Sequence, residues 1–371
     1  MKYNFKKMIV KDICKFLEDK YPLVYKEDYD NCGLLIGDNL QTVSNVLVTL
    51  DCTDEILNEA IKKNCELIIC HHPIIFKGIK KITGANYTEK IISKAIKNDI
   101  SIYAIHTNLD NHHQGVNNKI AEKLGLINCQ ILAPKKQLIN KLVVHTPIDS
   151  AKKIREALFE AGAGNIGNYS NCSFNTIGEG TFKGNDKSKP TLGKKESLEN
   201  ISEIKIEVIF PLHKKAEVLA KMLSVHPYEE VSYEITTLEN FHQNIGSGMF
   251  GHLEKEMNSV NFIQFLKQQM QTNCVRHTNL INKTIKTVAF CGGSGSFLLG
   301  NARRVNADIY ISADFKYHEF FDSENDIIIA DIGHYESEQF TSELLADILK
   351  ENFTKFATHL SDINTNPIHY S

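Results

Sequence analysis

Histidine and carboxylate side chains follow three separate apolar runs in this sequence. The runs and the polar residues after them are "ELIIC" with His71 and His72, "ISIYAI" with His106 and Asp110, and "DIIIAD" with His334 and Glu338. Imidazole and carboxylate groups are ligands for divalent metals such as zinc, iron and manganese. If the three runs end close together in space, these residues predict metal-dependent chemistry.

The number and spacing of the candidate ligands favour two metal ions over one. His334 and Glu338 stand at i and i+4, which places both side chains on one face of a helix. With His71, His72 and Asp110 they make a set too large for one open catalytic ion. Such a set suits two ions about 3.5–4 Å apart that share a carboxylate and keep water positions. The two adjacent histidines would then serve different ions.

Each of these residues also has a simpler interpretation. A histidine after a strand is usually a solvated or capping residue, and Asp110 could cap a helix that begins near Gly115. His334 and Glu338 could form an ordinary pair in the first turn of a helix. Only the convergence of all three runs on one edge of a sheet favours the metal site over these alternatives.

Other polar residues are weaker candidates for the same cleft. His106, Lys316 and His318 follow predicted strands and could contact a substrate, although solvated loop residues show the same pattern. The turn "GGSGS" resembles an anion-binding turn at a helix start, but it lacks the lysine of a P-loop. His112 and His113 are expected to be exposed.

The elements that must position these residues alternate between strand and helix. Apolar runs of strand length at 43–51, 65–70 and 100–105 are separated by helical patterns at 54–64 and 87–99. We expect Thr53 or Asp54 to cap the first of these helices. The succession predicts a parallel sheet with crossover helices, in which ligands bind beyond the carboxyl ends of the strands.

The same alternation returns late in the chain. Strand patterns at 285–291, 307–314 and 326–331 precede a closing helix from about Tyr335. The predicted fold class is therefore α/β, with two parallel-sheet halves that form one metal-binding domain.

A different pattern separates the two halves. Two segments each read as a strand followed by a helix, and the Gly-, Lys- and Ser-rich stretch between them, at 175–200, is expected to be a loop. We expect a small α+β domain at 136–245, inserted between the halves 1–135 and 246–371.

Composition narrows the class of protein. The chain has 371 residues, 42% hydrophobic and 23% charged, which suits two or more globular domains. A net charge of -3 provides no basic field for nucleic acid, so a small-molecule ligand is expected instead. Nine cysteines without a CxxC motif predict reduced, mostly buried thiols, with Cys70 in the core.

Targeting signals are not evident in the sequence. Residues 1–22 read as an amphipathic helix without an apolar signal core, and no run reaches the roughly 20 apolar residues of a membrane span. We therefore expect a cytoplasmic protein without a membrane partner.

Several segments resemble the GTP cyclohydrolase 1 type 2 homologue family, also called the NIF-three-like family. They are "YDNCGLLIGD", "LVTLDCTDEILNEAI", "HHPIIFKGIKKI", "HTNLDNHHQGVNNKIAEKLGL", "GGSGSF", "DIYISADFKYHEF" and "DIGHYESEQF". They occur in order over nearly the whole chain. The segments "GAGNIGNYSNCSF", "GEGTF" and "HPYEEVSYEI" are similar to the extra PII/CutA-like domain of longer bacterial members.

The resemblance implies a homo-oligomer, a hexameric ring of two trimers, with two divalent metal ions per subunit. Carried over by motif, the family's metal ligands fall on His71, His72, Asp110, His334 and Glu338, with Glu338 bridging. Tyr29 stands where the family often has Trp, and His112 and His113 replace small residues, which could alter access to the site.

Two functions are therefore open. The first is a dinuclear-metal-dependent hydrolase that acts on a nucleotide or a related small molecule through a metal-activated water. The family name implies GTP, opened at its imidazole ring, and phosphoester hydrolysis is an equally natural use of a metal pair. The alternative is a non-catalytic metal-binding regulatory or metal-handling protein with a ligand-sensing insert.

Overall fold

The chain divides into two compact units in the computed structural model, which describes residues 7–281 and 284–371. We call Met1–Pro134 with Gln243–Ser371 the main unit and Lys135–His242 the insert. The boundaries show that the insert interrupts the main unit once.

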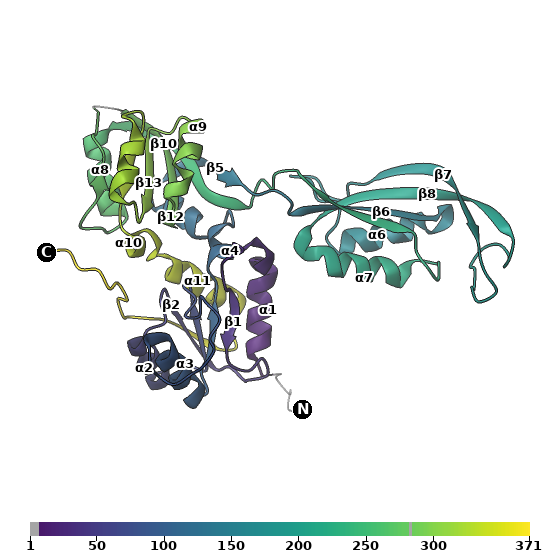
Figure 1. The fold of residues 1–371 in the computed structure, drawn as a ribbon, viewed down its shortest axis with the longest axis horizontal. Helices are drawn as coiled ribbons and strands as arrows, with labels where there is room; N and C mark the ends of the chain where they lie inside the picture. Colours follow the sequence, from purple (N-terminus) through teal and green to yellow (C-terminus); the bar gives the residue numbers. More distant parts are fainter. Residues whose placement is uncertain (1–6, 282–283) are drawn as a thin grey trace. The chain divides into compact units, whose positions relative to one another are not determined.

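The main unit contains most of the helices (Figure 1). They are α1 Val10–Lys20, α2 Asp54–Lys62, α3 Tyr87–Lys97, α4 Thr107–Asp110, α5 Val116–Lys123, α8 Ser259–Gln269, α9 Leu299–Arg304, α10 His334–Glu338 and α11 Thr341–Asn352, with the 3-10 helices η1 Leu23–Tyr25, η4 Ser296–Leu298 and η5 Tyr317–Ser323. Of the predicted N-terminal helix, residues 1–6 lie outside the described residues. Within the part of the chain that the structure describes, no helix is long and apolar enough to cross a bilayer.

The first sheet of the main unit has five strands in the order β1-β4-β3-β2-β15. Their bounds are β1 Gly33–Ile36, β2 Asn45–Thr49, β3 Leu67–Cys70, β4 Ser101–Ala104 and β15 Ala357–Leu360. Strands β15, β2, β3 and β4 are parallel, as predicted, but β1 joins β4 in the antiparallel direction. Every residue of β3 and β4 is buried, since both faces of a parallel sheet are covered.

The second sheet has six strands in the order β11-β14-β13-β12-β10-β5. Their bounds are β5 Leu126–Pro134, β10 Gly246–Asn258, β11 Arg276–His277, β12 Thr284–Ser294, β13 Ile309–Ala313 and β14 Ile328–Asp331. Strands β12, β13 and β14 are parallel, whereas β10, β5 and β11 add antiparallel pairs. The predicted α/β class with two parallel-sheet halves is thus confirmed, although each sheet also contains antiparallel pairs.

One hydrophobic core spans both halves of the main unit. Val48, Ile69 and Tyr103 from the first sheet belong to the same buried cluster as Phe290 and Ile311 from the second. Helix α2 begins as predicted, because the Thr53 hydroxyl oxygen accepts a hydrogen bond from the Ile56 amide at 3.3 Å. A shared core of this kind holds the ends of both sheets in a defined arrangement.

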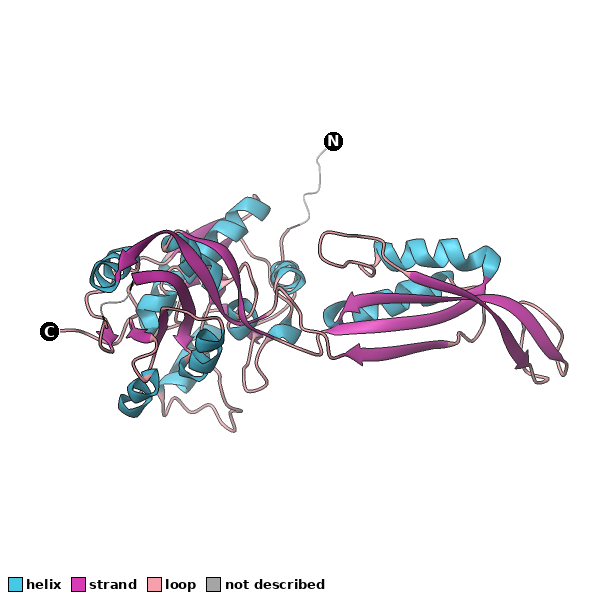
Figure 2. Cartoon of the chain, turned by 90° about the horizontal axis from the view of Figure 1, so that it is seen from above, coloured by secondary structure: helices cyan, strands magenta, loops and turns pink. Residues whose placement is uncertain are grey.

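The insert is an antiparallel sheet with helices and a core of its own (Figure 2). Its elements are β6 Ile139–Pro147, β7 Phe174–Lys183, β8 Leu198–Pro211, β9 Tyr233–Leu238, α6 Ala151–Glu160 and α7 Lys215–Val225, with η2 Ile148–Ser150 and η3 Leu212–Lys214. The strand order is β7-β8-β6-β9, and burial alternates along β6, so one face of this strand is covered. Likeness to the PII/CutA group remains a prediction.

The prediction of a loop at 175–200 is confirmed for 184–197, which lies between β7 and β8, and is wrong at its two ends, which are strands. Strand β7 occupies 174–183 and pairs with β8 along its whole length. Most residues of β7 are exposed, so the strand carries polar residues and glycines in place of an apolar pattern. The composition of this segment therefore did not indicate that it pairs with β8 as a strand.

Candidate metal centre

His71 and His72 follow the buried strand β3, where the chain turns away from the sheet. The amides of both residues donate to the Leu50 carbonyl at 3.0 Å, and this turn fixes their backbone. The His71 ring is fully buried, with Nδ1 2.8 Å from the Ile105 carbonyl oxygen. Because a carbonyl can only accept, Nδ1 carries the proton and Nε2 has its lone pair free for a metal. Cys70 points into the core, as predicted.

His72 lies between two carboxylates. Its Nδ1 is 2.7 Å from Asp51 Oδ1, and its Nε2 is 2.9 Å from Glu338 Oε2. The first contact orients the ring, and the second brings the face of β3 together with helix α10.

Helix α10 presents His334 and Glu338 on the same face, as their spacing predicts. His334 Nε2 lies 3.2 Å from Glu338 Oε2 and 3.4 Å from His72 Nε2, while His334 Nδ1 lies 2.6 Å from Asp314 Oδ2. The two histidines therefore direct the same kind of ring nitrogen to one carboxylate oxygen.

Glu338 belongs to two clusters of possible metal ligands. One contains His72, His334 and Glu338, and the other His71, Asp110 and Glu338, with the ligand atoms of each cluster within 4.8 Å of one another. Oε2 contacts the first cluster, and Oε1 is 3.9 Å from His71 Nε2. The five predicted ligands are thus brought together around a buried carboxylate that faces both groups.

Two buried atoms of the second cluster have no hydrogen-bond partner among the residues that the structure describes. They are His71 Nε2 and Asp110 Oδ1, which lie 3.4 Å apart. Leaving a buried polar group unpaired costs about 1–3 kcal/mol. A divalent cation between these two atoms would satisfy both, so the residues fit a metal ion. Asp110 does not cap α5, whose first residue is preceded by Gly115 without a side-chain cap.

His106 lies beside the predicted metal ligands His71 and His72. It forms a third cluster with His71 and His72, again with ligand atoms within 4.8 Å. Its Nδ1 is 2.9 Å from Oδ1 of the buried Asp30, which also accepts a hydrogen bond from the Thr107 amide at 3.0 Å. The prediction that His106 contacts substrate stays a prediction.

Three carboxylates behind the histidines were missed in the sequence. Asp51 holds His72, Asp314 holds His334 and Asp30 holds His106. Carboxylates in this position fix the orientation and tautomer of a metal-binding imidazole. Asp51 and Asp314 both stand just after apolar strands, so the strand-end criterion that selected the histidines would have found them too.

Charges around the rings set their protonation in the absence of a cation. Burial lowers the pKa of His72, but Asp51 and Glu338 outweigh it and raise the pKa to about 10. Burial also lowers the pKa of His334, but Glu338 and Asp314 outweigh this effect and raise the pKa to about 11. Burial, with Glu338 nearby, raises the pKa of Asp110. Protons bound to His72 and His334 therefore offset the negative charge of the neighbouring carboxylates.

Lys316 and His318 lie outside the three clusters. Both are exposed at the start of η5, where the Lys316 amide donates to Glu319 Oε2 at 2.9 Å and the His318 ring packs 5.2 Å from Tyr317. His318 joins no candidate metal group among residues 7–281 and 284–371. Their role as substrate contacts remains a prediction.

The "GGSGS" turn packs against α10. The Gly293 amide donates to Ser337 Oγ at 2.9 Å, and the left-handed φ of Gly293, +63°, brings its backbone against Glu338. A Cβ added at Gly293 would meet Glu338 Oε1, so the Glu338 side chain lies directly beside this glycine.

His112 and His113 are half-buried, which corrects the expectation that they are exposed. The His112 ring meets the edge of Tyr21 at 5.0 Å, and the His113 amide donates to the Asn244 carbonyl. These contacts tie the loop after α4 to its surroundings.

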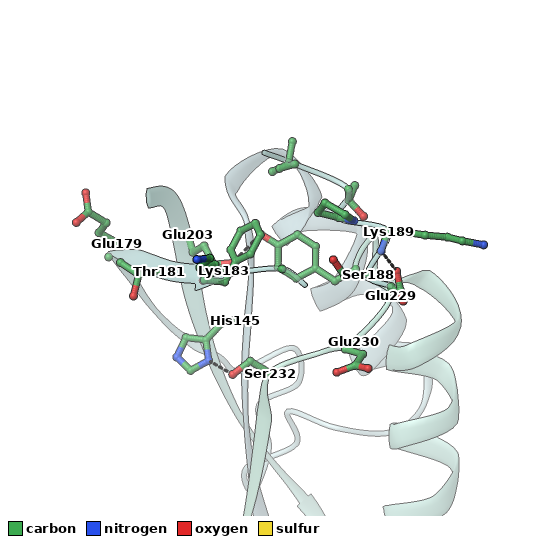
Figure 3. A pocket seen from close by; sticks show the side chains of 18 of the residues that line it. His145, Glu179, Thr181, Lys183, Ser188, Lys189, Glu203, Glu229, Glu230 and Ser232 are labelled. Atoms are coloured by element: carbon green, nitrogen blue, oxygen red, sulfur yellow. Dashed lines mark hydrogen bonds between the residues drawn. The ribbon is translucent and has the colours of Figure 1, made fainter. Parts of the chain in front are cut away.

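The insert has a pocket that contains none of the predicted metal ligands (Figure 3). Its volume is about 850 Å³, and it is lined by β7, the loop after it, and residues of β8. Glu203 accepts a hydrogen bond from Tyr228, and Glu229 accepts one from the Lys189 amide, both at 2.7 Å. Lysines such as Lys183 line the same pocket, so its wall carries both signs of charge.

The fold and the cluster define a class: an α/β protein with a histidine and carboxylate centre that could bind metal. The family model for Duf34/NIF3 (NGG1p interacting factor 3) matches residues 8–367. The chain therefore belongs to the Duf34/NIF3 family, and the resemblance stated from the sequence is confirmed.

Relatives match over nearly the full length. The chain is 37% identical over 361 residues to a GTP cyclohydrolase 1 type 2 homolog of Bacillus subtilis, covering 96% of each chain. It is 34% identical over 368 residues to the protein of the same name from Staphylococcus epidermidis, covering 98% of this chain and 100% of the relative. A solved Bacillus cereus protein related to NIF3 superposes with a TM-score of 0.85 at 35% identity, covering 99% of this chain and 100% of the other.

Proposed function

We propose that this protein is a hydrolase that depends on two divalent metal ions and acts on a nucleotide or a related small molecule. The observation that carries the proposal is the position of Glu338, whose two oxygens face two separate groups of possible ligands. A carboxylate shared in this way is what a metal pair about 3.5–4 Å apart requires.

The chain's own residues divide between the two positions. His72 and His334 would hold one ion, His71 and Asp110 the other, and Glu338 would bridge them. Bound in such a site, zinc, iron or manganese lowers the pKa of water and so supplies a nucleophile at neutral pH. Asp51 and Asp314 hold the rings of His72 and His334 so that Nε2 of each ring would be available to an ion.

The substrate class follows from the relatives and from the chemistry. The relatives are named GTP cyclohydrolase 1 type 2 homologs, which favours a purine nucleotide opened at its imidazole ring. A metal pair also suits hydrolysis of a nucleotide phosphoester. We further propose a homo-oligomer, a hexameric ring of two trimers, whose mass can be measured by light scattering.

Metal analysis followed by a nucleotide hydrolysis screen tests this proposal. We expect about two divalent ions per chain and hydrolysis that a chelator abolishes and added metal restores. Glu338→Gln should lower metal affinity by more than about 100-fold, since loss of an outer-shell partner alone typically costs 10–100-fold. Glu343→Gln is the control, because Glu343 lies on α11 and pairs with Lys123. Full hydrolysis by metal-stripped protein would contradict the mechanism.

The insert pocket favours a second candidate function. A metal-binding regulator could sense a charged small molecule in this cavity while the metal centre serves a structural or storage role. Absence of hydrolysis across the screen, together with full metal occupancy and small-molecule binding by the insert, would favour this alternative.

A further inference from the structure

The segment 361–371, here called the strap, lies along the supports of the metal centre. It follows β15, which pairs with β2, and the Ser361 amide extends that pairing by donating to the Val48 carbonyl at 2.9 Å. Ile363 then packs against the hydrophobic cluster of the first sheet. The beginning of the strap is therefore anchored beside the end of β2.

Thr365 contacts the carboxylate that orients His72. Its hydroxyl donates to Asp51 Oδ2 at 2.6 Å, while Asp51 Oδ1 lies 2.7 Å from His72 Nδ1. Each oxygen of Asp51 thus has its own hydrogen-bond partner, Thr365 or His72, so the carboxylate cannot rotate without losing a contact. This geometry keeps Nδ1 of His72 as the donor and leaves Nε2 for Glu338 and a metal ion.

The next residue contacts the other half of the centre. Asn366 Nδ2 donates at 3.0 Å to Oε1 of the buried Glu336, which lies on α10 between His334 and Glu338. Thr365 therefore contacts Asp51, which orients His72, and the adjacent Asn366 contacts α10, the helix that carries two predicted ligands.

We infer that Thr365 and Asn366 are positioning residues of the metal centre, and that the strap couples the β2 side of the site to α10. The inference rests on the proposed function, because it assigns these residues a role toward the same ions. Thr365 acts through Asp51, and Asn366 acts through Glu336; neither contacts a predicted ligand directly in these hydrogen bonds.

Cobalt binding by the full chain tests the inference, since Co²⁺ reports both affinity and ligand geometry in its visible absorption. Thr365→Val removes the hydroxyl and keeps the shape, so we expect Co²⁺ affinity to fall about 10-fold or more and the absorption bands to change. Thr365→Ser should restore both. Thr358→Val, a substitution of the same kind on β15, is the matched control and should leave both unchanged.

A double-mutant cycle separates positioning from general stability. If Thr365 acts through Asp51, Thr365→Val should have little further effect on Co²⁺ affinity in an Asp51→Asn background. Equal affinity and spectra for the wild-type protein and Thr365→Val would overturn the inference and leave the metal centre standing, as would full additivity in the cycle. A wild-type protein that binds no Co²⁺ would overturn the proposed function, and the inference with it.

Discussion

At the scale of single residues, the three histidines predicted as metal ligands, His71, His72 and His334, have similar surroundings. One nitrogen of each ring is held by a carbonyl or a carboxylate, and the other faces Glu338 or Asp110. The same carboxylates that would attract a cation raise the pKa of His72 and His334. Metal and proton therefore compete for the same ring nitrogens.

This competition predicts that metal affinity increases with pH. With pKa values of about 10 and about 11, both rings are protonated in the metal-free protein between pH 6 and 8. Metal uptake must displace these protons, so affinity should increase by about tenfold per pH unit for each proton released. Zinc titrations at pH 6, 7 and 8, with proton release followed in weak buffer, measure the effect. Affinity independent of pH would show that the rings are already neutral.

At the scale of elements, α10 is fitted closely to the last residues of β12. Gly293 has a left-handed φ of +63°, and a Cβ there would collide with Glu338 Oε1. Glycine at position 293 therefore permits both the left-handed backbone near the end of β12 and the observed position of the Glu338 carboxylate.

We expect Gly293→Ala to displace Glu338 and weaken metal binding by about 10-fold or more, comparable to loss of an outer-shell partner. The left-handed backbone adds a stability loss of about 1–2 kcal/mol. Gly300→Ala is the control, because Gly300 lies in α9 with open space around its Cβ position. It should bind metal normally and be up to about 1 kcal/mol more stable. Metal titration and thermal unfolding measure both variants; normal metal binding by Gly293→Ala would contradict the prediction.

At the scale of the whole molecule, the insert leaves and rejoins the main unit at neighbouring strands. Pro134 at the end of β5 pairs with Gly246 at the start of β10. All five predicted metal ligands belong to the main unit, and the insert has a separate core. Among the described residues, none of the three clusters of possible metal ligands includes a residue of the insert.

Replacing 136–242 with a short Gly-Ser bridge should therefore leave the number of metal ions per chain unchanged. The reason is that the β5–β10 pairing already brings the two cut ends together. Metal analysis and unfolding of the shortened chain measure this, and the isolated segment 135–242 should unfold cooperatively as its counterpart. A folded main unit that lost its metal would contradict the prediction.

Much of the fold could be read from local patterns. Apolar runs of strand length predicted β2, β3, β4, β12, β13 and β14, because a buried parallel strand needs apolar residues on both faces. The polar strand β7 escaped prediction, because most of its residues are exposed and backbone pairing without burial leaves little trace in composition. The candidate metal ligands could be found because His71, His72, Asp110, His334 and Glu338 follow apolar runs that end as strands.

The sequence by itself determined which side chains could do chemistry and which strands carry them. Only the tertiary structure decided which atoms meet: that Glu338 faces two groups, that His106 joins His71 and His72, and that Thr365 reaches Asp51. The reason is physical. Residue type and spacing are set along the chain, but the distance between His72 and Glu338 depends on how two sheets pack around one core.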